Sequence, residues 1–420
     1  MSEGKAFDVD EFAEHFDHHS PEYAAHTYEI YEHMREKCPV AHSDAYGGMW
    51  VVTRYRDIMK IARDDKTFSS AQGITMPMLP PANGAEDADP TKHGPTRIPI
   101  IMDPPRSREF RKLLDPLFTP RVFQAMEPDI RRLATERIDG FIESGEGDLV
   151  HDLAQPLTAI MTLRLGGLPQ DQWREYADPI HRVIWGDGLP EELYRARMGV
   201  TNLVKEQVRL QRREPVPGGL IEHLMGCTID GRPLEDWEVV AIIELLLDGG
   251  VDTTQALLGS AFIFLARNPD YRQQLIDDPA LIPDATEEFL RVFAPQQALA
   301  RTVTEDTEIG GVPMKKGEKV MMCWASGNRD EAEFENADQV IFGREENRHM
   351  TFGVGSHRCM GSNLARMEIR VCLEEVLSRL PDYELDEAGI ESAPDVGVVY
   401  GYKRVPVRFS PGPRRRAESE

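Results

Sequence analysis

Residues 352–361, FGVGSHRCMG, place one cysteine among three glycines and directly before an amphipathic helical pattern over 362–380. Cys359 is therefore expected at the N-terminus of a helix, where free backbone N–H groups and the helix dipole favour an anionic sulfur. Glycines at 353, 355 and 361 allow the backbone to turn tightly and to approach a flat group closely. A thiolate in this position can act as a nucleophile or as a metal ligand.

The residues around Cys359 favour a metal ligand. A nucleophile needs a base within reach, and His357 is only two residues away, which is an awkward geometry for such a pair. The five cysteines contain no C-x-x-C pair, so zinc lacks partner ligands, and the third glycine of a G-x-G-x-x-G dinucleotide loop is missing. One thiolate can, however, be the sole protein ligand of a large planar cofactor, as in some haem proteins.

The composition indicates a reduced, cytoplasmic protein. The chain has 420 residues and a net charge of −24, which argues against nucleic acid and anionic membranes as general partners. The N-terminus has no apolar signal region, and no apolar run reaches the ~18 residues of a membrane-spanning helix. We expect a polar N-terminal segment over 1–21, one domain over 22–409 and a disordered tail over 410–420.

Hydrophobic periodicity predicts a mainly α-helical fold with small β-sheets. The longest predicted helix runs from Leu234 to about Arg267, is apolar on nearly all sides and has Pro233 at its first turn. Strand patterns cover 49–55, 307–322 and 396–409. Residues 73–100 contain six prolines and three glycines, which predicts an irregular functional lid.

The stretch around Cys359 resembles the haem-binding signature of the cytochrome P450 family, F-x-x-G-x-[RH]-x-C-x-G. Phe352, Gly355, His357, Cys359 and Gly361 match it. The resemblance covers roughly 22–409 and is greatest to the soluble bacterial class. It implies the mostly α P450 fold and haem b, with Cys359 as the iron ligand and Phe352 and Gly361 in the cofactor-binding loop.

Two further motifs match this family. Glu288 and Arg291 form its E-x-x-R pair on one helix face, and Arg344 stands where the family has the arginine that completes a structural triad. GGVDTT, residues 249–254, resembles the segment of the long helix that opens over the haem. There Gly250 would leave room at the cofactor, and Asp252 and Thr253 would pass protons to the dioxygen that is being reduced.

The resemblance also implies partners for the two haem propionates. Arg111, Arg301 and His357 match the usual positions, and an arginine makes paired, charge-assisted bonds to a carboxylate. Ser107 stands where many members carry a histidine, so this chain departs from the family there.

The implied function is a monooxygenase that oxidises a small to medium apolar substrate with dioxygen. Because the chain has no flavin or iron–sulfur motif, its electrons would come from NAD(P)H through a ferredoxin reductase and a 2Fe-2S or similar small ferredoxin. Alternatives are a peroxide-driven peroxygenase and a non-catalytic haem sensor or binding protein. The retained Asp252 and Thr253 argue against both.

Two sets of residues are predicted around the cofactor. A basic surface on the thiolate side would receive the ferredoxin through Arg108, Lys112, Arg358 and Arg366. The substrate pocket would include Leu245, Asp248, Gln297, Val398 and Val399. Asp248 replaces a usually apolar family residue. It either bonds a lid residue such as Arg97, away from the substrate, or faces the pocket and meets a polar group of the substrate.

Overall fold

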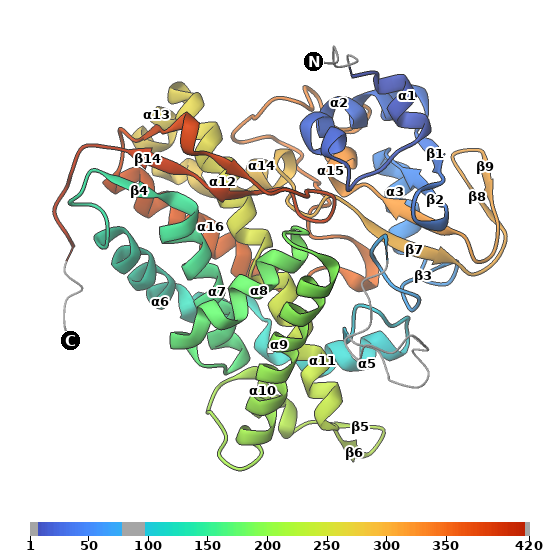
Figure 1. Ribbon diagram of the computed structural model, residues 1–420, viewed down its shortest axis with the longest axis horizontal. Helices are drawn as coiled ribbons and strands as arrows, with labels where there is room; N and C mark the ends of the chain where they lie inside the picture. Colours follow the sequence, from blue (N-terminus) through green and yellow to red (C-terminus); the bar gives the residue numbers. More distant parts are fainter. Residues whose placement is uncertain (1–6, 78–96, 416–420) are drawn as a thin grey trace.

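The computed structural model describes residues 7–77 and 97–415, and the predicted lid at 73–100 therefore falls largely outside the described residues. Figure 1 shows a larger helical part, in green, yellow and red, beside a smaller part in which blue and orange strands form a sheet. The mainly α architecture with small sheets agrees with the sequence prediction. The longer helices are α2 (Pro21–Lys37), α3 (Tyr55–Arg63), α5 (Arg106–Leu114), α6 (Pro120–Asp139), α7 (Gln155–Gly166), α8 (Trp173–Ile184), α9 (Pro190–Gln211), α11 (Asp236–Gly250), α12 (Thr253–Arg267), α13 (Pro269–Asp277), α14 (Ile282–Val292) and α16 (Ser362–Arg379).

The main sheet has five strands in the order β1-β2-β10-β7-β3. Its neighbours are antiparallel except for β2 and β10, which run parallel with Trp50 opposite Val320. The strands are β1 (Val40–Ser43), β2 (Met49–Val52), β10 (Lys319–Met322), β7 (Leu299–Val303) and β3 (Phe68–Ser69). β7 carries Arg301 from this sheet to the edge of the helical part, so the sheet positions one wall of the site.

The smaller sheets and single-turn helices connect the larger elements. β11, β14 and β4 form a three-stranded sheet, and β12–β13, β5–β6 and β8–β9 form separate pairs. These strands are β4 (Glu146–Asp148), β5 (Thr228–Ile229), β6 (Arg232–Pro233), β8 (Thr307–Ile309), β9 (Val312–Met314), β11 (Glu384–Leu385), β12 (Glu391–Ser392), β13 (Tyr402–Arg404) and β14 (Pro406–Arg408). The short helices are α1 (Val9–Glu14), η3 (Leu149–Ala154), α10 (Leu220–Met225) and α15 (Trp324–Gly327).

The prediction of one uninterrupted helix over 234–267 is wrong at two places. Pro233 belongs to β6, and the helix begins only after Glu235, whose backbone N–H donates to Glu238 Oε2 at 2.8 Å. The helix then breaks between Gly250 and Thr253. At the break, the Thr253 hydroxyl donates to the Gly249 carbonyl at 2.8 Å and the Thr158 hydroxyl to the Val251 carbonyl at 3.0 Å. Side chains thus satisfy carbonyls beside two poor helix formers.

The chain ends pack onto the same body. Phe16, which follows α1, is fully buried and contacts the ring of Tyr23 from α2. Near the other end, Arg415 forms an ion pair with Glu375 of α16 at 3.3 Å, while 416–420 lie outside the described residues. Across the described ranges, no helix is both long and apolar enough to cross a membrane.

Candidate active site

One cavity brings together most of the predicted site residues. It lies between the Cys359 loop, the break between α11 and α12, and the edge of the main sheet. The predicted residues that line it are Arg111, Leu245, Gly250, Thr253, Arg301, Phe352, His357, Cys359 and Gly361. Residues as far apart in the sequence as Arg111 and Gly361 thus line a single site. Largely apolar walls are added by Ile98, Pro99, Pro295, Gln296 and Leu299, of which Ile98 and Pro99 belong to the predicted lid segment 73–100.

The Cys359 loop is fixed by its glycines and by one backbone bond. Gly353 and Gly355 have φ values of 63° and 76°, which glycine adopts without strain. A Cβ at Gly355 would also lie 2.6 Å from the Ala62 carbonyl oxygen. The Cys359 N–H donates to the Phe352 carbonyl at 2.8 Å and closes the loop. The loop therefore presents the thiol to the cavity two residues before Gly361, the N-cap of α16.

Opposing effects act on the Cys359 thiol. Burial is the largest effect and raises the pKa of Cys359 overall, whereas the Gly361 N–H and the nearby charges of Arg111 and Arg358 offset part of this rise. These groups favour the thiolate, the form of sulfur that binds a metal ion. The donor set is therefore chemically suited to a single thiolate–iron bond.

A cluster of basic side chains lines the cavity without acidic partners. Arg301 is almost fully buried, and its guanidinium donates to its own neighbour, the Ala300 carbonyl, at 3.1 Å. Arg111 donates to the Arg358 carbonyl at 2.7 Å. Within the described ranges, neither arginine forms an ion pair. Burial lowers the pKa of Arg301 to about 10, and burial with the two neighbouring arginines lowers that of His357 to about 4.

Such a cluster fits the carboxylates of a haem. Buried cations are normally paired, and two propionates would supply the missing negative charge. Ser107, which replaces the usual histidine, is fully buried on α5 and does not line the cavity. Its hydroxyl has no hydrogen-bond partner among the described residues. The basic cluster therefore rests on Arg111, Arg301 and His357.

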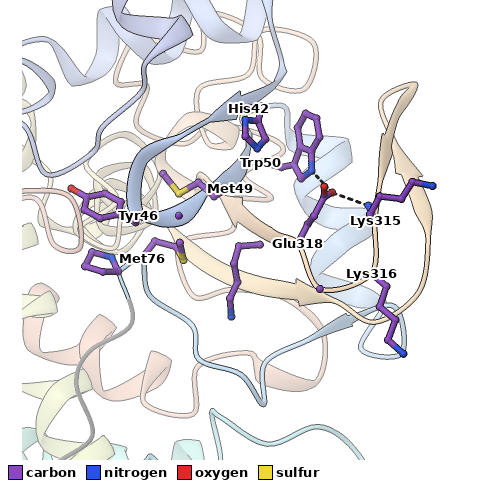
Figure 2. Close-up of a pocket in the computed structure, with 13 residues that line it drawn as sticks. His42, Tyr46, Met49, Trp50, Met76, Lys315, Lys316 and Glu318 are labelled. Atoms are coloured by element: carbon purple, nitrogen blue, oxygen red, sulfur yellow. Dashed lines mark hydrogen bonds between the residues drawn. The ribbon is translucent and has the colours of Figure 1, made fainter. Parts of the chain in front are cut away.

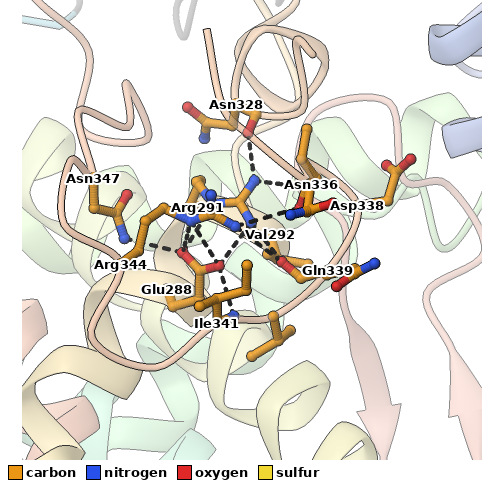
Figure 3. Close-up of polar contacts among 12 residues, drawn as sticks. Glu288, Arg291, Val292, Asn328, Asn336, Asp338, Gln339, Ile341, Arg344 and Asn347 are labelled. Carbon is orange, nitrogen blue, oxygen red and sulfur yellow. Dashed lines mark hydrogen bonds and ion pairs between the residues drawn. The ribbon is translucent and has the colours of Figure 1, made fainter.

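Glu288, Arg291 and Arg344 form a buried charge cluster, which we call the staple cluster (Figure 3). Two nitrogens of Arg291 donate to the Glu288 carboxylate at 2.8 and 2.9 Å, and Arg344 Nε donates to it at 3.1 Å. Arg291 also donates to three backbone carbonyls of the loops that follow α15, those of Asn328, Ala337 and Gln339. The cluster thereby ties α14 to the chain that leads to the Cys359 loop.

The wall opposite Cys359 is formed where α11 meets α12. A Cβ at Gly250 would lie 2.4 Å from Thr162 Oγ1, so this glycine is needed for the close packing of α11 on α7. A Cβ at Gly249 would meet no described atom within 4 Å. Thr253 faces the cavity. Asp252 does not line it; its fully buried carboxylate is bonded to His181 of α8, a partner that the sequence did not predict.

Asp248 does not line the cavity either. Its carboxylate is paired with Arg97 and with Arg197, the latter at 2.5 Å. Arg97 also donates to Glu244 at 3.1 Å. We call Arg97, Arg197, Glu244 and Asp248 the clasp cluster, because it joins residue 97 to α9 and α11. The hypothesis that Asp248 bonds Arg97 agrees with this arrangement, and the hypothesis that it faces the substrate does not.

Three other predicted pocket residues also lie outside the cavity lining. Gln297 is fully buried, and its amide donates to the Ala294 carbonyl at 2.7 Å. The Val398 carbonyl accepts the Gln297 backbone N–H at 3.0 Å, and Val399 pairs with Gln296. This pairing directs the 398–399 backbone towards 296–297. As a result Gln296, and not Gln297, lines the cavity, and Gln296 was not predicted individually. Glu368 of α16 also lines the cavity unpredicted, and burial raises the pKa of its carboxyl well above the usual range.

The predicted basic surface is only partly available. Arg108, Lys112 and Arg358 are exposed. Arg366 instead forms an ion pair with Glu287 at 2.5 Å, and its guanidinium lies 4.5 Å from the Phe352 ring centre. Arg366 therefore packs behind the Cys359 loop rather than offering a free charge.

A second hollow lies on the outer side of the main sheet, near the turn between β1 and β2 (Figure 2). Trp50 Nε1 donates there to Glu318 Oε2 at 2.7 Å, with Lys315 and Met76 at its rim. It shares no lining residue with the Cys359 cavity. The chemistry described above therefore belongs to the Cys359 cavity alone.

Comparison with known proteins agrees with this site. The family model for cytochrome P450 matches residues 190–387. Cytochrome P450 130 of Mycobacterium tuberculosis is 33% identical over 375 residues, which cover 86% of this chain and 90% of that protein. A steroid C26-monooxygenase of Mycolicibacterium smegmatis is 32% identical over 390 residues, which cover 91% and 92%. A solved structure of a P450 EryK mutant with erythromycin B superposes with a TM-score of 0.83, at 31% identity and 94% and 98% coverage.

The fold, the thiolate loop and these relatives define a haem-thiolate protein, and the chain belongs to the cytochrome P450 family. It is a monooxygenase with haem b as its cofactor. As in the rest of the family, dioxygen is a reactant and electrons reach the haem indirectly from NAD(P)H through redox partners.

Proposed function

We propose that this enzyme hydroxylates or otherwise oxidises a small to medium apolar substrate, with electrons from a 2Fe-2S or similar ferredoxin and its reductase. The observation that carries the proposal is the cavity in which Cys359 lies opposite the α11–α12 break, with Arg111, Arg301 and His357 at its edge. When bound, haem b supplies the redox chemistry that activates dioxygen and transfers one oxygen atom to the substrate.

The residues of this chain have separate roles in that reaction. Cys359 ligates the iron, and Phe352 and Gly361 shape the loop that holds the sulfur in place. Arg111, Arg301 and His357 would bind the propionates of the haem, and Gly250 allows α11 to pack closely on α7 in the cavity wall. Thr253 donates a proton towards the dioxygen from the cavity wall, and Asp252 supplies protons from behind it.

The walls favour an apolar substrate. Leu245, Ile98, Pro295 and Leu299 border the cavity, and the polar Asp248 is occupied by two arginines outside it. A relative named steroid C26-monooxygenase and a neighbour solved with erythromycin B indicate that pockets of this family also hold molecules as large as a steroid or a macrolide. A panel of steroids, fatty acids, terpenoids and small aromatics is therefore the right screen, read as the spectral change when a ligand displaces water from the iron.

The electron donor is proposed to dock on Arg108, Lys112 and Arg358. These exposed cations flank the Cys359 loop in a chain of net charge −24, so they offer a local attraction to an acidic ferredoxin. The cytoplasmic location expected from the sequence stays a prediction.

The ferrous–carbonyl spectrum tests the thiolate assignment directly. Wild-type protein is expected to give the strongly red-shifted thiolate band, and Cys359→Ala is expected to lose it. Cys372→Ala, at a buried cysteine of α16 that does not line the cavity, is the matched control. A Cys359→Ala protein that kept the band would sink the assignment.

A second experiment separates the monooxygenase from its alternatives. With a ligand from the screen, NAD(P)H plus ferredoxin and reductase should give product at a rate that exceeds the rate with hydrogen peroxide alone. Turnover with peroxide only would indicate a peroxygenase. Ligand binding without product in either assay would indicate a haem sensor or binding protein.

A further inference from the structure

Asp252 is closed off from solvent. Its side chain has 0% exposure, and its Oδ1 is bonded to His181 Nδ1. On its other side Thr253 lines the cavity, with its hydroxyl turned to the Gly249 carbonyl. A proton that leaves Asp252 towards the cavity must therefore be replaced through the protein on the α8 side.

Several buried polar atoms gather on that side without hydrogen-bond partners among the described residues. They are Asp252 Oδ2, His181 Nε2, Trp185 Nε1 and both amide atoms of Gln255. His181 and Trp185 stack with ring centres 5.4 Å apart, and Gln255 follows Asp252 by three residues, on the same face of α12. Buried polar groups are nearly always satisfied by protein or by ordered water. These atoms therefore form a buried polar cluster that suits ordered water.

His181 is the member of this group whose side chain can accept a proton at one atom and release one from another. The indole N–H of tryptophan is only a donor, and the glutamine amide does not exchange protons in this way, whereas imidazole carries one donor and one acceptor nitrogen. One nitrogen of His181, Nδ1, contacts Asp252, and the other, Nε2, has no hydrogen-bond partner among the described residues.

We propose that His181 is the positioning residue through which Asp252 regains its protons from solvent; this rests on the proposed roles of Asp252 and Thr253. A proton arriving through water binds Nε2 and gives an imidazolium. The Nδ1–H bond then breaks as an O–H bond forms at Asp252, which leaves the imidazole neutral. The ring then carries its one proton on Nε2. After Asp252 has passed its own proton on, the starting tautomer returns when Nε2 releases that proton to the ordered water and Nδ1 takes one up from it. Trp185 and Gln255 hold the water that reaches Nε2.

The test compares two substitutions in the haem-loaded enzyme. His181→Gln keeps an N–H that can bond Asp252 but cannot carry a proton, and His181→Phe removes both functions. Each variant is assayed with ferredoxin, reductase, NADPH and the screen ligand that gives the largest spectral change. Product and hydrogen peroxide formed per NADPH are measured in H2O and in D2O.

If His181 relays protons, both variants should form less product per NADPH than wild type. Product per NADPH should fall by about 100-fold in His181→Gln and in His181→Phe, the lower end of the usual contribution of a positioned acid or base. Peroxide should rise and the solvent isotope effect should grow, while the dissociation constant of the ligand stays unchanged. If His181→Gln keeps wild-type coupling and isotope effect, His181 only holds Asp252 in place, and the proposal is overturned.

Two further variants separate this proposal from the one on which it rests. His151→Gln is the matched control, because His151 forms a histidine–aspartate contact with Asp152 at 2.9 Å on the exposed surface. It should couple like wild type. If Asp252→Asn also couples like wild type, the relay role of Asp252 itself fails. If Asp252→Asn uncouples while His181→Gln does not, only the role of His181 is rejected.

Discussion

The staple cluster and the clasp cluster each combine buried arginines with carboxylates, yet they are satisfied in different ways. In the staple cluster, Glu288 and Arg291 have no exposed side-chain surface, and Arg291 also donates to three backbone carbonyls. In the clasp cluster, Arg197 pairs with the side chains of Asp248 and Glu244, and Asp248 keeps 22% of its side-chain surface exposed. Arg197 Nε has no described partner.

The difference indicates two functions for buried charge. Backbone carbonyls from a long loop cannot find a partner by packing alone, so the staple cluster fixes the course of that loop towards Cys359. The clasp cluster joins side chains of separate elements, with Arg97 and Arg197 on either side of Asp248. We therefore expect the first cluster to govern folding and haem retention, and the second to govern how residue 97 is held against α9 and α11.

The largest effect is expected from Arg291→Met. It removes one of the two arginines paired with the Glu288 carboxylate and a donor to three backbone carbonyls, and breaking a buried pair in this way costs about 3–5 kcal/mol. The free energy of unfolding in urea and the haem content after purification measure the loss. Arg267→Met, at an exposed pair with Glu387, is the control and should cost less than about 1 kcal/mol. Equal losses in the two variants would remove the structural role of the staple cluster.

A smaller effect is expected from Asp248→Asn. Arg97 and Arg197 keep Glu244 as a partner, so the loss of stability should be about 1–3 kcal/mol. Because residue 97 directly precedes Ile98 in the cavity wall, the rate of ligand release measured by stopped flow should rise. The control is Asp236→Asn, because Asp236 lies on the same helix as Asp248 and forms an exposed ion pair with Arg212. Unchanged ligand release in Asp248→Asn would mean that the clasp does not hold this wall.

A contact at residue 76, near the start of the predicted lid segment, predicts a pH dependence of stability. His19 contacts Asp395 at 2.6 Å and the Met76 carbonyl at 2.7 Å. Burial lowers the pKa of His19, but the hydrogen bond and charge of Asp395 outweigh it and raise the pKa above the usual 6.5. Its stabilisation is therefore full below pH 6.5 and is lost as the pH rises through the raised value.

His19→Gln should accordingly lower the free energy of unfolding by about 0.5–1 kcal/mol at pH 6 and by less at pH 9. The carboxylates behave in the opposite way. Burial raises the pKa of Asp248, but Arg197 and Arg97 outweigh it and lower the pKa, so that stabilisation is lost only as the pH falls below its usual 3.8. Chemical unfolding at several pH values separates the two. A His19→Gln deficit that grew towards alkaline pH would contradict the assignment.

The smallest effect on stability is expected at the exposed cations. Arg108→Glu should change the free energy of unfolding by less than about 0.5 kcal/mol. It should nevertheless slow reduction by an acidic ferredoxin at low ionic strength and weaken the salt dependence of that rate. Arg56→Glu, at an exposed arginine of α3, is the control. Equal reduction rates in the two variants would remove the docking surface.

The local parts of the site could be predicted from sequence. Glu288 and Arg291 are three residues apart on one helix, and this spacing places both on the same face. The glycines beside Cys359 predict the tight turn of its loop. The carbonyl partners of Arg291 could not be foreseen, because they lie in irregular chain 37 to 48 residues further on. The family pattern supplied Arg344, whereas no pattern in the chain itself links it to Glu288.

Contacts between distant elements account for what the sequence missed. Asp252 and His181 are 71 residues apart, and Asp248 and Arg197 are 51 apart, so no spacing predicts either pair. The apolar pattern over 234–267 correctly predicted buried helical chain, but as one continuous helix, because it could not show that hydroxyls of Thr158 and Thr253 would bond carbonyls at a break. Gln297 and Gln296 are adjacent, and only the bridge to Val399 decides which of them reaches the cavity.

The paired glycines of α11 have a consequence for reshaping the enzyme. Position 250 is closed to redesign, because any side chain there would meet Thr162 and separate two helices. Position 249 borders the same cavity and has open space where its Cβ would be. An alanine there should add about 1 kcal/mol of helix propensity while taking one methyl group of volume from the pocket. Residue 249 is thus a place to adjust which substrates fit without disturbing the scaffold.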